Sequence, residues 1–172
     1  MVIRDEDSRT EGSSAKKSIA HLVIGFVILA FMGHEIPKRV VLSLSNSVGH
    51  RVFYYQKTPD PSQIHKGDFV VFDIETDLIP NCNPCRIVKK VGCVEGEELN
   101  RTQDGAYFCG QMFLGMAKEK TRKGIRLHAF DYSGKVPPQC IFASSGHKDG
   151  YDSRYIGFVR KEAIQGKAIP IL

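Results

Sequence analysis

A polar segment that ends in two lysines precedes one uninterrupted apolar run at the start of the chain. The polar segment covers residues 1–17, and residues 18–33 carry no charged side chain. As a helix this run would be about 24 Å long, against about 30 Å for the hydrocarbon core of a bilayer. Apolar residues would surround such a helix completely, which disfavours a core helix. We therefore expect a transmembrane signal anchor, with a cleavable signal peptide or a buried core helix as alternatives.

Basic residues flank the apolar run unequally. Four of them precede it and two follow it closely: Arg4, Arg9, Lys16 and Lys17 before, Lys38 and Arg39 after. Because basic residues favour the cytoplasmic side of a membrane, residues 1–17 are expected to form a cytoplasmic tail. The chain from residue 34 onward would then lie on the other side.

The rest of the chain alternates short apolar runs with turn residues. The runs are rich in β-branched and aromatic residues, and Gly, Pro, Asn and Asp separate them. They cover residues 52–55, 68–75, 86–91, 106–109, 112–114, 125–128, 141–143 and 156–160. No run alternates with a long amphipathic helix. This pattern predicts one mainly β, antiparallel domain over residues 34–172.

The composition excludes several classes of protein. Of 172 residues, 42% are hydrophobic and 25% are charged, unlike a disordered chain, a collagen-like repeat or a long coiled coil. The 24 Lys and Arg exceed the 19 Asp and Glu by five, which is too few to indicate nucleic-acid binding alone. The chain has no Trp to build a base-stacking platform. No nucleic-acid partner is expected.

Five cysteines leave at least one unpaired if the others form disulfides: Cys82, Cys85, Cys93, Cys109 and Cys140. Cys82 and Cys85 have C-x-x-C spacing in a loop rich in Pro and Asn, which favours a structural disulfide. A redox motif would open a helix in a βαβ unit, and none is visible. Half of a zinc site, with Cys93 and Cys109, is the other alternative, but a second C-x-x-C is lacking. No metal and no cofactor are expected.

Ser43, Ser45 and Ser47 are candidates for a catalytic nucleophile. They alternate along an expected strand and would share one face, which also fits a polar sheet edge. A serine nucleophile needs a base. A Ser-His-Asp triad would use His50 or His147, although no Gly-x-Ser-x-Gly elbow occurs.

Lysine is the other possible base. Lys89 and Lys90 lie in an otherwise apolar strand, where neighbours point to opposite faces, so only one of them can be buried. Burial lowers the pKa of a lysine and lets it act as a neutral base. A lysine on the solvent face of a strand is the simpler alternative.

These pieces, taken in order, resemble the type I signal peptidases, and most closely their conjugative-transfer (TraF-type) pilin peptidase branch. The Ser-x-Ser motif of the family resembles Ser45-Asn-Ser47, and its Gly-Asp-x-Val motif resembles Gly67-Asp68-Phe-Val70. Its lysine stretch resembles residues 89–97, and its C-terminal motif resembles Asp152-Ser153-Arg154. The small size of the chain favours the conjugative branch, since little room remains for the large extra β domain of housekeeping enzymes.

The resemblance implies a signal-peptidase-like antiparallel β catalytic domain preceded by one N-terminal transmembrane helix. Ser47 would be the nucleophile, Lys89 the general base, and Ser45 would support the oxyanion through its hydroxyl. Asp152 and Arg154 lie two residues apart on an expected strand. They would form an ion-paired structural brace near the site, as against two independent surface charges.

Four segments depart from the family pattern, and one of them is Ser144-Ser145-Gly146, which replaces a Gly-Asp-Asn ahead of Asp152-Ser153-Arg154. Val48-Gly49-His50 stands where a proline often follows the nucleophile, and Glu95 replaces the proline of the lysine stretch. Gly150 replaces a hydroxyl residue that helps to hold the lysine in the family. Ser144 or Ser145 is the alternative source of that hydroxyl.

The implied function is a membrane-anchored serine endopeptidase that removes a signal or leader peptide from exported precursors, in particular a conjugative prepilin. Some members of the branch also join the ends of the pilin into a ring. The enzyme would cross the inner membrane once, with its catalytic domain in the periplasm near type IV secretion or conjugation components. The alternative is a non-catalytic, membrane-anchored pilus or secretion assembly factor with the same β fold. A self-cleaving Ser-Lys repressor would need a DNA-binding domain where the apolar run stands.

Overall fold

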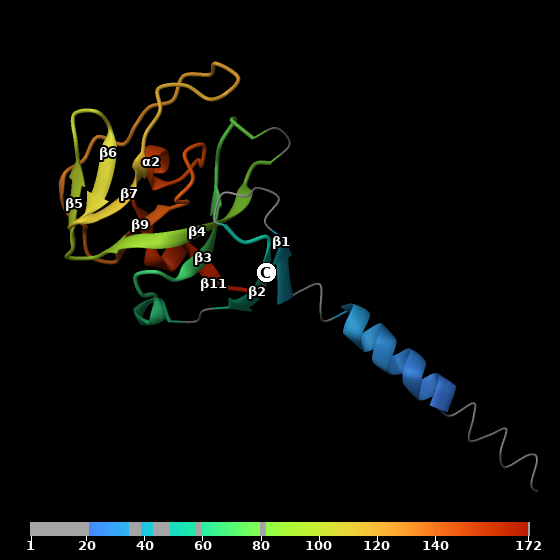
Figure 1. Ribbon diagram of the computed structural model, residues 1–172. Helices are drawn as coiled ribbons and strands as arrows, with labels where there is room; N and C mark the ends of the chain where they lie inside the picture. Colours follow the sequence, from blue (N-terminus) through green and yellow to red (C-terminus); the bar gives the residue numbers. More distant parts are fainter. Residues whose placement is uncertain (1–20, 35–38, 43–48, 58–59, 80–81, 172) are drawn as a thin grey trace, which may run out of the picture. The chain divides into compact units, whose positions relative to one another are not determined.

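The computed structural model describes residues 21–34, 39–42, 49–57, 60–79 and 82–171, in two compact units, Met1–Arg39 and Val40–Leu172 (Figure 1). In the first unit residues 21–34 form a helix, whose large apolar side chains are exposed, Leu22 by 74% and Phe26 by 73%. No helix in the described part of the chain is both long enough and apolar enough to cross a membrane. The predicted anchor begins at residue 18, outside the described residues.

The second unit is built on a seven-stranded sheet in which all neighbouring strands are antiparallel. In spatial order the strands are β1 (Val40–Leu42), β2 (Val52–Lys57), β11 (Ile164–Pro170), β3 (Phe69–Ile74), β4 (Cys85–Val94), β9 (Cys140–Ser144) and β10 (Val159–Arg160). This architecture confirms the prediction of a mainly β, antiparallel domain.

A second, four-stranded sheet contains β7 (Met112–Met116), β6 (Ala106–Cys109), β5 (Glu98–Arg101) and β8 (Gly134–Lys135). The chain passes from β4 to β5 through a tight turn at Gly96, whose φ of +79° suits glycine. A disulfide between Cys93 and Cys109 also joins the two sheets. By closing a 16-residue separation it stabilises the fold by about 3 kcal/mol in the chain-entropy description.

The described part of this unit also contains three short helices: η2 (Pro61–Gln63), α2 (Ser153–Ile156) and η3 (Lys161–Ala163). The strand predicted over residues 156–160 is therefore wrong in its first part, because Ile156 ends α2 and β10 begins at Val159. The strand predicted over residues 125–128 is also wrong. It is one side of a short hairpin with a single bridge between Lys120 and Arg126.

Strand β11 was not predicted, although it lies between β2 and β3. Its sequence contains Gly166 and Pro170, which weaken a strand pattern. Gly166 is needed there, because a Cβ atom would lie 2.4 Å from the backbone oxygen of Gln56 on the neighbouring strand. Close packing of the β11 and β2 backbones therefore requires Gly166, and this glycine weakens the sequence pattern by which β11 could have been predicted.

Two disulfides form, and they leave Cys140 as the free cysteine. The Cys82–Cys85 bridge confirms the structural disulfide predicted for the C-x-x-C loop. Cys93 pairs with Cys109. These two cysteines therefore do not combine with Cys82 and Cys85 in the zinc site considered as an alternative.

Candidate active site

Lys89 lies in the middle of β4, an interior strand of the large sheet between β3 and β9. On its own face it stands between Ile87 and Val91, which pack in the largest apolar cluster of the sheet. Val88 points to the opposite face and belongs to a second cluster. Lys89 is 5% exposed, whereas Lys90 is exposed. The prediction that only one of the two lysines is buried is confirmed.

Burial lowers the pKa of Lys89 below its ordinary value of 10.5, because removal from water penalises the ammonium form. The carboxylate of Asp152 acts in the opposite direction, and the guanidinium of Arg154 lowers the pKa further. Within the described residues no hydrogen bond or ion pair reaches the Lys89 amine. A buried amine that pairs with no carboxylate among the described residues favours the neutral form that a general base requires.

The Gly67-Asp68-Phe-Val70 segment fixes the strand beside Lys89. Val70 pairs with Lys89 across the β3–β4 ladder. At the start of β3, Gly67 N donates to Val91 O at 2.9 Å and Val91 N donates to Asp68 O at 2.7 Å. Gly67 has a φ of +93°, which allows the chain to turn into β3. The segment therefore sets the register that turns Lys89 inward.

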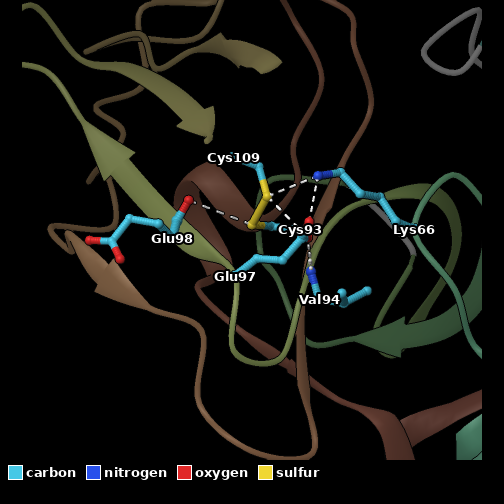
Figure 2. The surroundings of a disulfide bond; sticks show 6 residues. All are labelled: Lys66, Cys93, Val94, Glu97, Glu98 and Cys109. Atoms are coloured by element: carbon cyan, nitrogen blue, oxygen red, sulfur yellow. Dashed lines mark hydrogen bonds and ion pairs between the residues drawn. A yellow bond between two sulfur atoms is a disulfide. The ribbon is translucent and has the colours of Figure 1, made fainter. Parts of the chain in front are cut away.

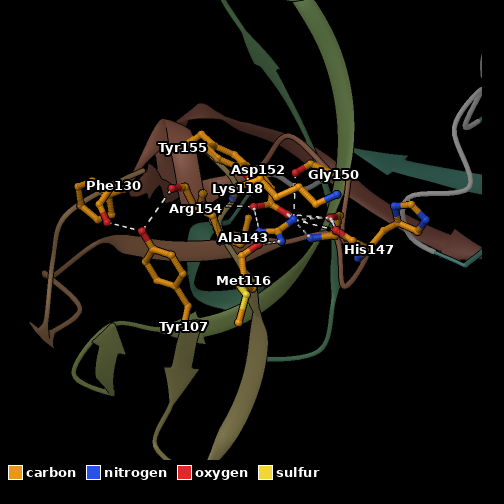
Figure 3. Close-up of polar contacts among 12 residues, drawn as sticks. Tyr107, Met116, Lys118, Phe130, Ala143, His147, Gly150, Asp152, Arg154 and Tyr155 are labelled. Atoms are coloured by element: carbon orange, nitrogen blue, oxygen red, sulfur yellow. Dashed lines mark hydrogen bonds and ion pairs between the residues drawn. The ribbon is translucent and has the colours of Figure 1, made fainter. Parts of the chain in front are cut away.

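Asp152 and Arg154 form a fully buried ion pair (Figure 3), and the charges of both residues act on the Lys89 amine. Arg154 Nε donates to Asp152 Oδ1 and Nη2 donates to Oδ2, both at 2.8 Å. The remaining guanidinium donors reach three backbone oxygens, those of Met116, His147 and Gly150, at 2.7 to 2.9 Å. The pair connects strand β7, the 145–150 loop and α2.

The two residues are paired as predicted, but the expected strand is wrong. Asp152 is the N-cap of α2 and accepts from the backbone N–H of Arg154 at 3.1 Å. A capping aspartate and the residue two positions later in the first helical turn lie close together, so the side chains meet without strand geometry. Tyr107 from the small sheet adds a contact, since its hydroxyl donates to the backbone oxygens of Phe130 and Arg154.

Ser145 occupies the space that a side chain at Gly150 would fill. An ideal Cβ at position 150 would lie 1.8 Å from Ser145 Oγ and 2.6 Å from its Cβ. The Ser145 hydroxyl donates to Asp152 Oδ2 at 2.7 Å, and the Ser145 backbone N–H donates to the same oxygen at 2.8 Å. Of the two serines considered as alternatives, Ser145 thus places a hydroxyl at position 150, where it binds Asp152.

Replacing Gly150 with serine should destabilise the protein by about 1–3 kcal/mol, because two side chains would share one space. Adding Ser145→Gly to Gly150→Ser should recover most of that loss, since the space is vacated and a hydroxyl is retained. Thermal unfolding of the two single variants and the double variant measures the coupling. Purely additive losses would show that the two positions do not compete for space.

A pocket of about 620 Å³ opens beside Lys89. Its walls combine apolar side chains from β3 and β4, Ile74 and Ile87, with basic side chains that follow β7. The basic segment, residues 118–126, was not singled out from the sequence. Its signal was present as five Lys or Arg among nine residues.

Ser43, Ser45 and Ser47 lie outside the described residues, between the end of β1 at Leu42 and residue 49. The two histidines considered as bases are both described. His50 packs edge-on against Phe53 and Phe69, and His147 Nδ1 accepts from the backbone N–H of Asp149 at 3.1 Å. Within the described residues neither imidazole meets a carboxylate, as a Ser-His-Asp triad would require.

One group of potential metal ligands comes together in the described part of the chain: Cys93, Glu97 and Cys109. Figure 2 shows that the two sulfurs are bonded to each other, so neither offers a thiolate. Glu97 is instead occupied by Lys66 Nζ at 2.7 Å and by the backbone N–H of Val94 at 2.9 Å. Cys93 and Cys109 therefore link the two sheets covalently, and Glu97 adds polar contacts beside them.

Comparisons with known proteins point to one family. The family model described as "Signal peptidase, peptidase S26" matches residues 13–172. A search of curated proteins finds no match. Among solved structures, a signal peptidase I from Enterococcus faecalis V583 is similar at 18% sequence identity and a TM-score of 0.38, covering 61% of this chain and 96% of that one.

Proposed function

The chain belongs to the signal peptidase family, peptidase S26, and we propose that it cuts its substrates with a Ser-Lys dyad of Ser47 and Lys89. Membership of this family makes it a serine endopeptidase, a hydrolase that acts on exported precursor proteins. The observation that carries the proposed site is Lys89, a lysine that is only 5% exposed and lines a pocket. Its lowered pKa suits a general base.

In the proposed mechanism the neutral Lys89 amine accepts the proton of the Ser47 hydroxyl as Ser47 Oγ attacks the scissile carbonyl. The resulting ammonium then donates that proton to the leaving amine, and an acyl-enzyme remains. Water, deprotonated by the same amine, hydrolyses the ester. The Ser45 hydroxyl and a backbone N–H would stabilise the oxyanion, and one such donor contributes about 3–4 kcal/mol. No step needs a metal or cofactor.

We propose a membrane anchor at residues 18–33, with residues 1–17 in the cytoplasm and residues 34–172 in the periplasm. Support comes from the uncharged run and from the exposed apolar side chains of the helix at 21–34. The proposed substrate is a conjugative prepilin. If the pilin's own amino terminus replaced water in attacking the Ser47 ester, the product would be a cyclic pilin.

Ser47→Ala should abolish precursor processing in membranes, with a rate loss of about 10³-fold or more, because the nucleophile is removed. Ser45→Ala should lose about 10²–10³-fold through the oxyanion, and Ser43→Ala is the matched control that should process normally. Precursor and product are separated by gel or mass spectrometry. Normal processing by Ser47→Ala would falsify the proposed nucleophile.

A further inference from the structure

A short basic hairpin borders the pocket that Lys89 lines. Residues 118–126 contain five Lys or Arg and one Glu, a net charge of +4 in a chain whose net charge is +5. Leu127 N donates to Glu119 O at 2.7 Å, and Thr121 N donates to Ile125 O at 2.8 Å. Positive charge is therefore concentrated on one hairpin beside the candidate site.

Only part of this charge is neutralised within the protein. Asp149 pairs with Lys118 and Arg122, which lowers the pKa of its carboxyl to about 2. Three further cations are exposed, line the pocket and form no ion pair with any described residue: Lys120, Lys123 and Lys148. These three can meet an anionic group that enters the pocket.

The floor of the same pocket is apolar. This floor is the side of the pocket formed by β3 and β4, where Ile74 and Ile87 lie together with Lys89. An extended peptide points successive side chains to opposite sides, so it can place apolar groups on the floor and acidic groups against the rim. A flat bilayer cannot enter a concave pocket in this way. The combination of shape and charge favours a peptide segment as the occupant.

We propose that this pocket selects precursor segments that carry acidic side chains within a few residues of the scissile bond, through Lys120, Lys123 and Lys148. The inference rests on the proposed function, because it takes Lys89 to mark the position of the reacting bond. It adds a charge preference to the apolar fit that the floor provides. Exposed pairs of this kind contribute modestly one by one and are screened by salt.

Peptide binding tests this preference without requiring cleavage. The full-length Ser47→Ala chain in neutral detergent would be titrated with a dansyl-labelled decapeptide whose central residues alternate leucine and glutamate. Its twin carries glutamine in place of glutamate. At low salt the glutamate probe should bind about fivefold more tightly, and the difference should vanish near 1 M salt. Lys120→Gln, Lys123→Gln and Lys148→Gln together should also remove it.

A matched control changes the same charge elsewhere: Lys57→Gln, Lys135→Gln and Arg160→Gln, none of which lines the pocket. Equal affinity for the two probes, no binding of the glutamate probe, or a preference kept by the pocket variant would each overturn the proposal. Loss of binding to phosphatidylglycerol vesicles in the pocket variant, without any peptide preference, would assign the cations to lipid instead.

Failure of this inference and failure of the proposed dyad can be told apart. Normal precursor cleavage with no peptide preference would refute the charge preference and leave the dyad intact. A retained preference with cleavage that survives Ser47→Ala would sink the proposed dyad.

Discussion

Replacing Arg154 with alanine is expected to lower the free energy of unfolding by about 3–5 kcal/mol, since the change leaves the carboxylate of Asp152 buried without its partner. The substitution also leaves the backbone oxygens of Met116, His147 and Gly150 without their donor. In thermal unfolding of the full chain in detergent, this corresponds to a fall in Tm of about 6–20 °C.

Arg160 provides the matched control. It pairs with Glu162, but both side chains are about three-quarters exposed, so Arg160→Ala should change stability by less than about 0.5 kcal/mol. Arg154→Lys should recover little, because one ammonium cannot replace a two-pronged guanidinium. A stability loss for Arg154→Ala as small as that of Arg160→Ala would show that the buried pair does not brace the fold.

The same substitution should alter the pH dependence of cleavage. Arg154 lowers the pKa of Lys89, and Asp152 raises it. Without Arg154 the field of Asp152 is uncompensated, so the pKa of Lys89 rises. Because the neutral amine is the active form, the acid limb of the rate profile of any residual activity should move to higher pH. If the acid limb of the rate profile did not move, the Asp152–Arg154 pair would not control the pKa of Lys89.

Lys89→Met should abolish processing while making the protein more stable near neutral pH. The catalytic loss should reach about 10³-fold or more, because the general base is removed. The gain in stability should be about 1–3 kcal/mol, since an apolar side chain replaces a buried amine without a hydrogen-bond partner among the described residues. Loss of activity with gained stability is the expected signature of a strained catalytic group.

The sign of the pH effect on stability follows from the lowered pKa of Lys89. Below the native pKa both states carry the proton, and the wild type bears the full cost of burying it. As pH rises toward the ordinary lysine value of 10.5, that cost disappears, because the unfolded state loses its proton as well. The advantage of Lys89→Met should therefore shrink with rising pH. Lys90→Met, on the exposed neighbour, should alter neither activity nor stability appreciably.

Much of the β domain could be predicted because its strands are regular. The runs that became β2, β3 and β4 are apolar and lie between turn residues, so their local pattern agrees with the sheet. Strand β11 was missed because Gly166 serves tertiary packing against Gln56, a requirement that no local pattern contains.

Only part of the candidate site could be predicted, because some of its contacts also depend on tertiary packing. Strand alternation predicted that only one of Lys89 and Lys90 is buried, and the resemblance to the signal peptidases selected Lys89. The pairing of Asp152 with Arg154 was expected, but its helical cap was not, because α2 has only four residues and carries no helical periodicity. The Ser145 side chain occupies the space beside Gly150 because of the conformation of the 145–150 loop. That conformation could not be predicted from the sequence.

The central claim, that Lys89 acts as the neutral base, is tested most directly by restoring an amine chemically. In a Cys140→Ala background, Lys89→Cys would be treated with 2-bromoethylamine, which rebuilds a lysine-like side chain of lower basicity. We expect Lys89→Cys to leave precursor uncut, and the aminoethylated protein to regain processing with its acid limb at lower pH than the wild type. Processing by untreated Lys89→Cys, or an acid limb that does not move after aminoethylation, would contradict the account.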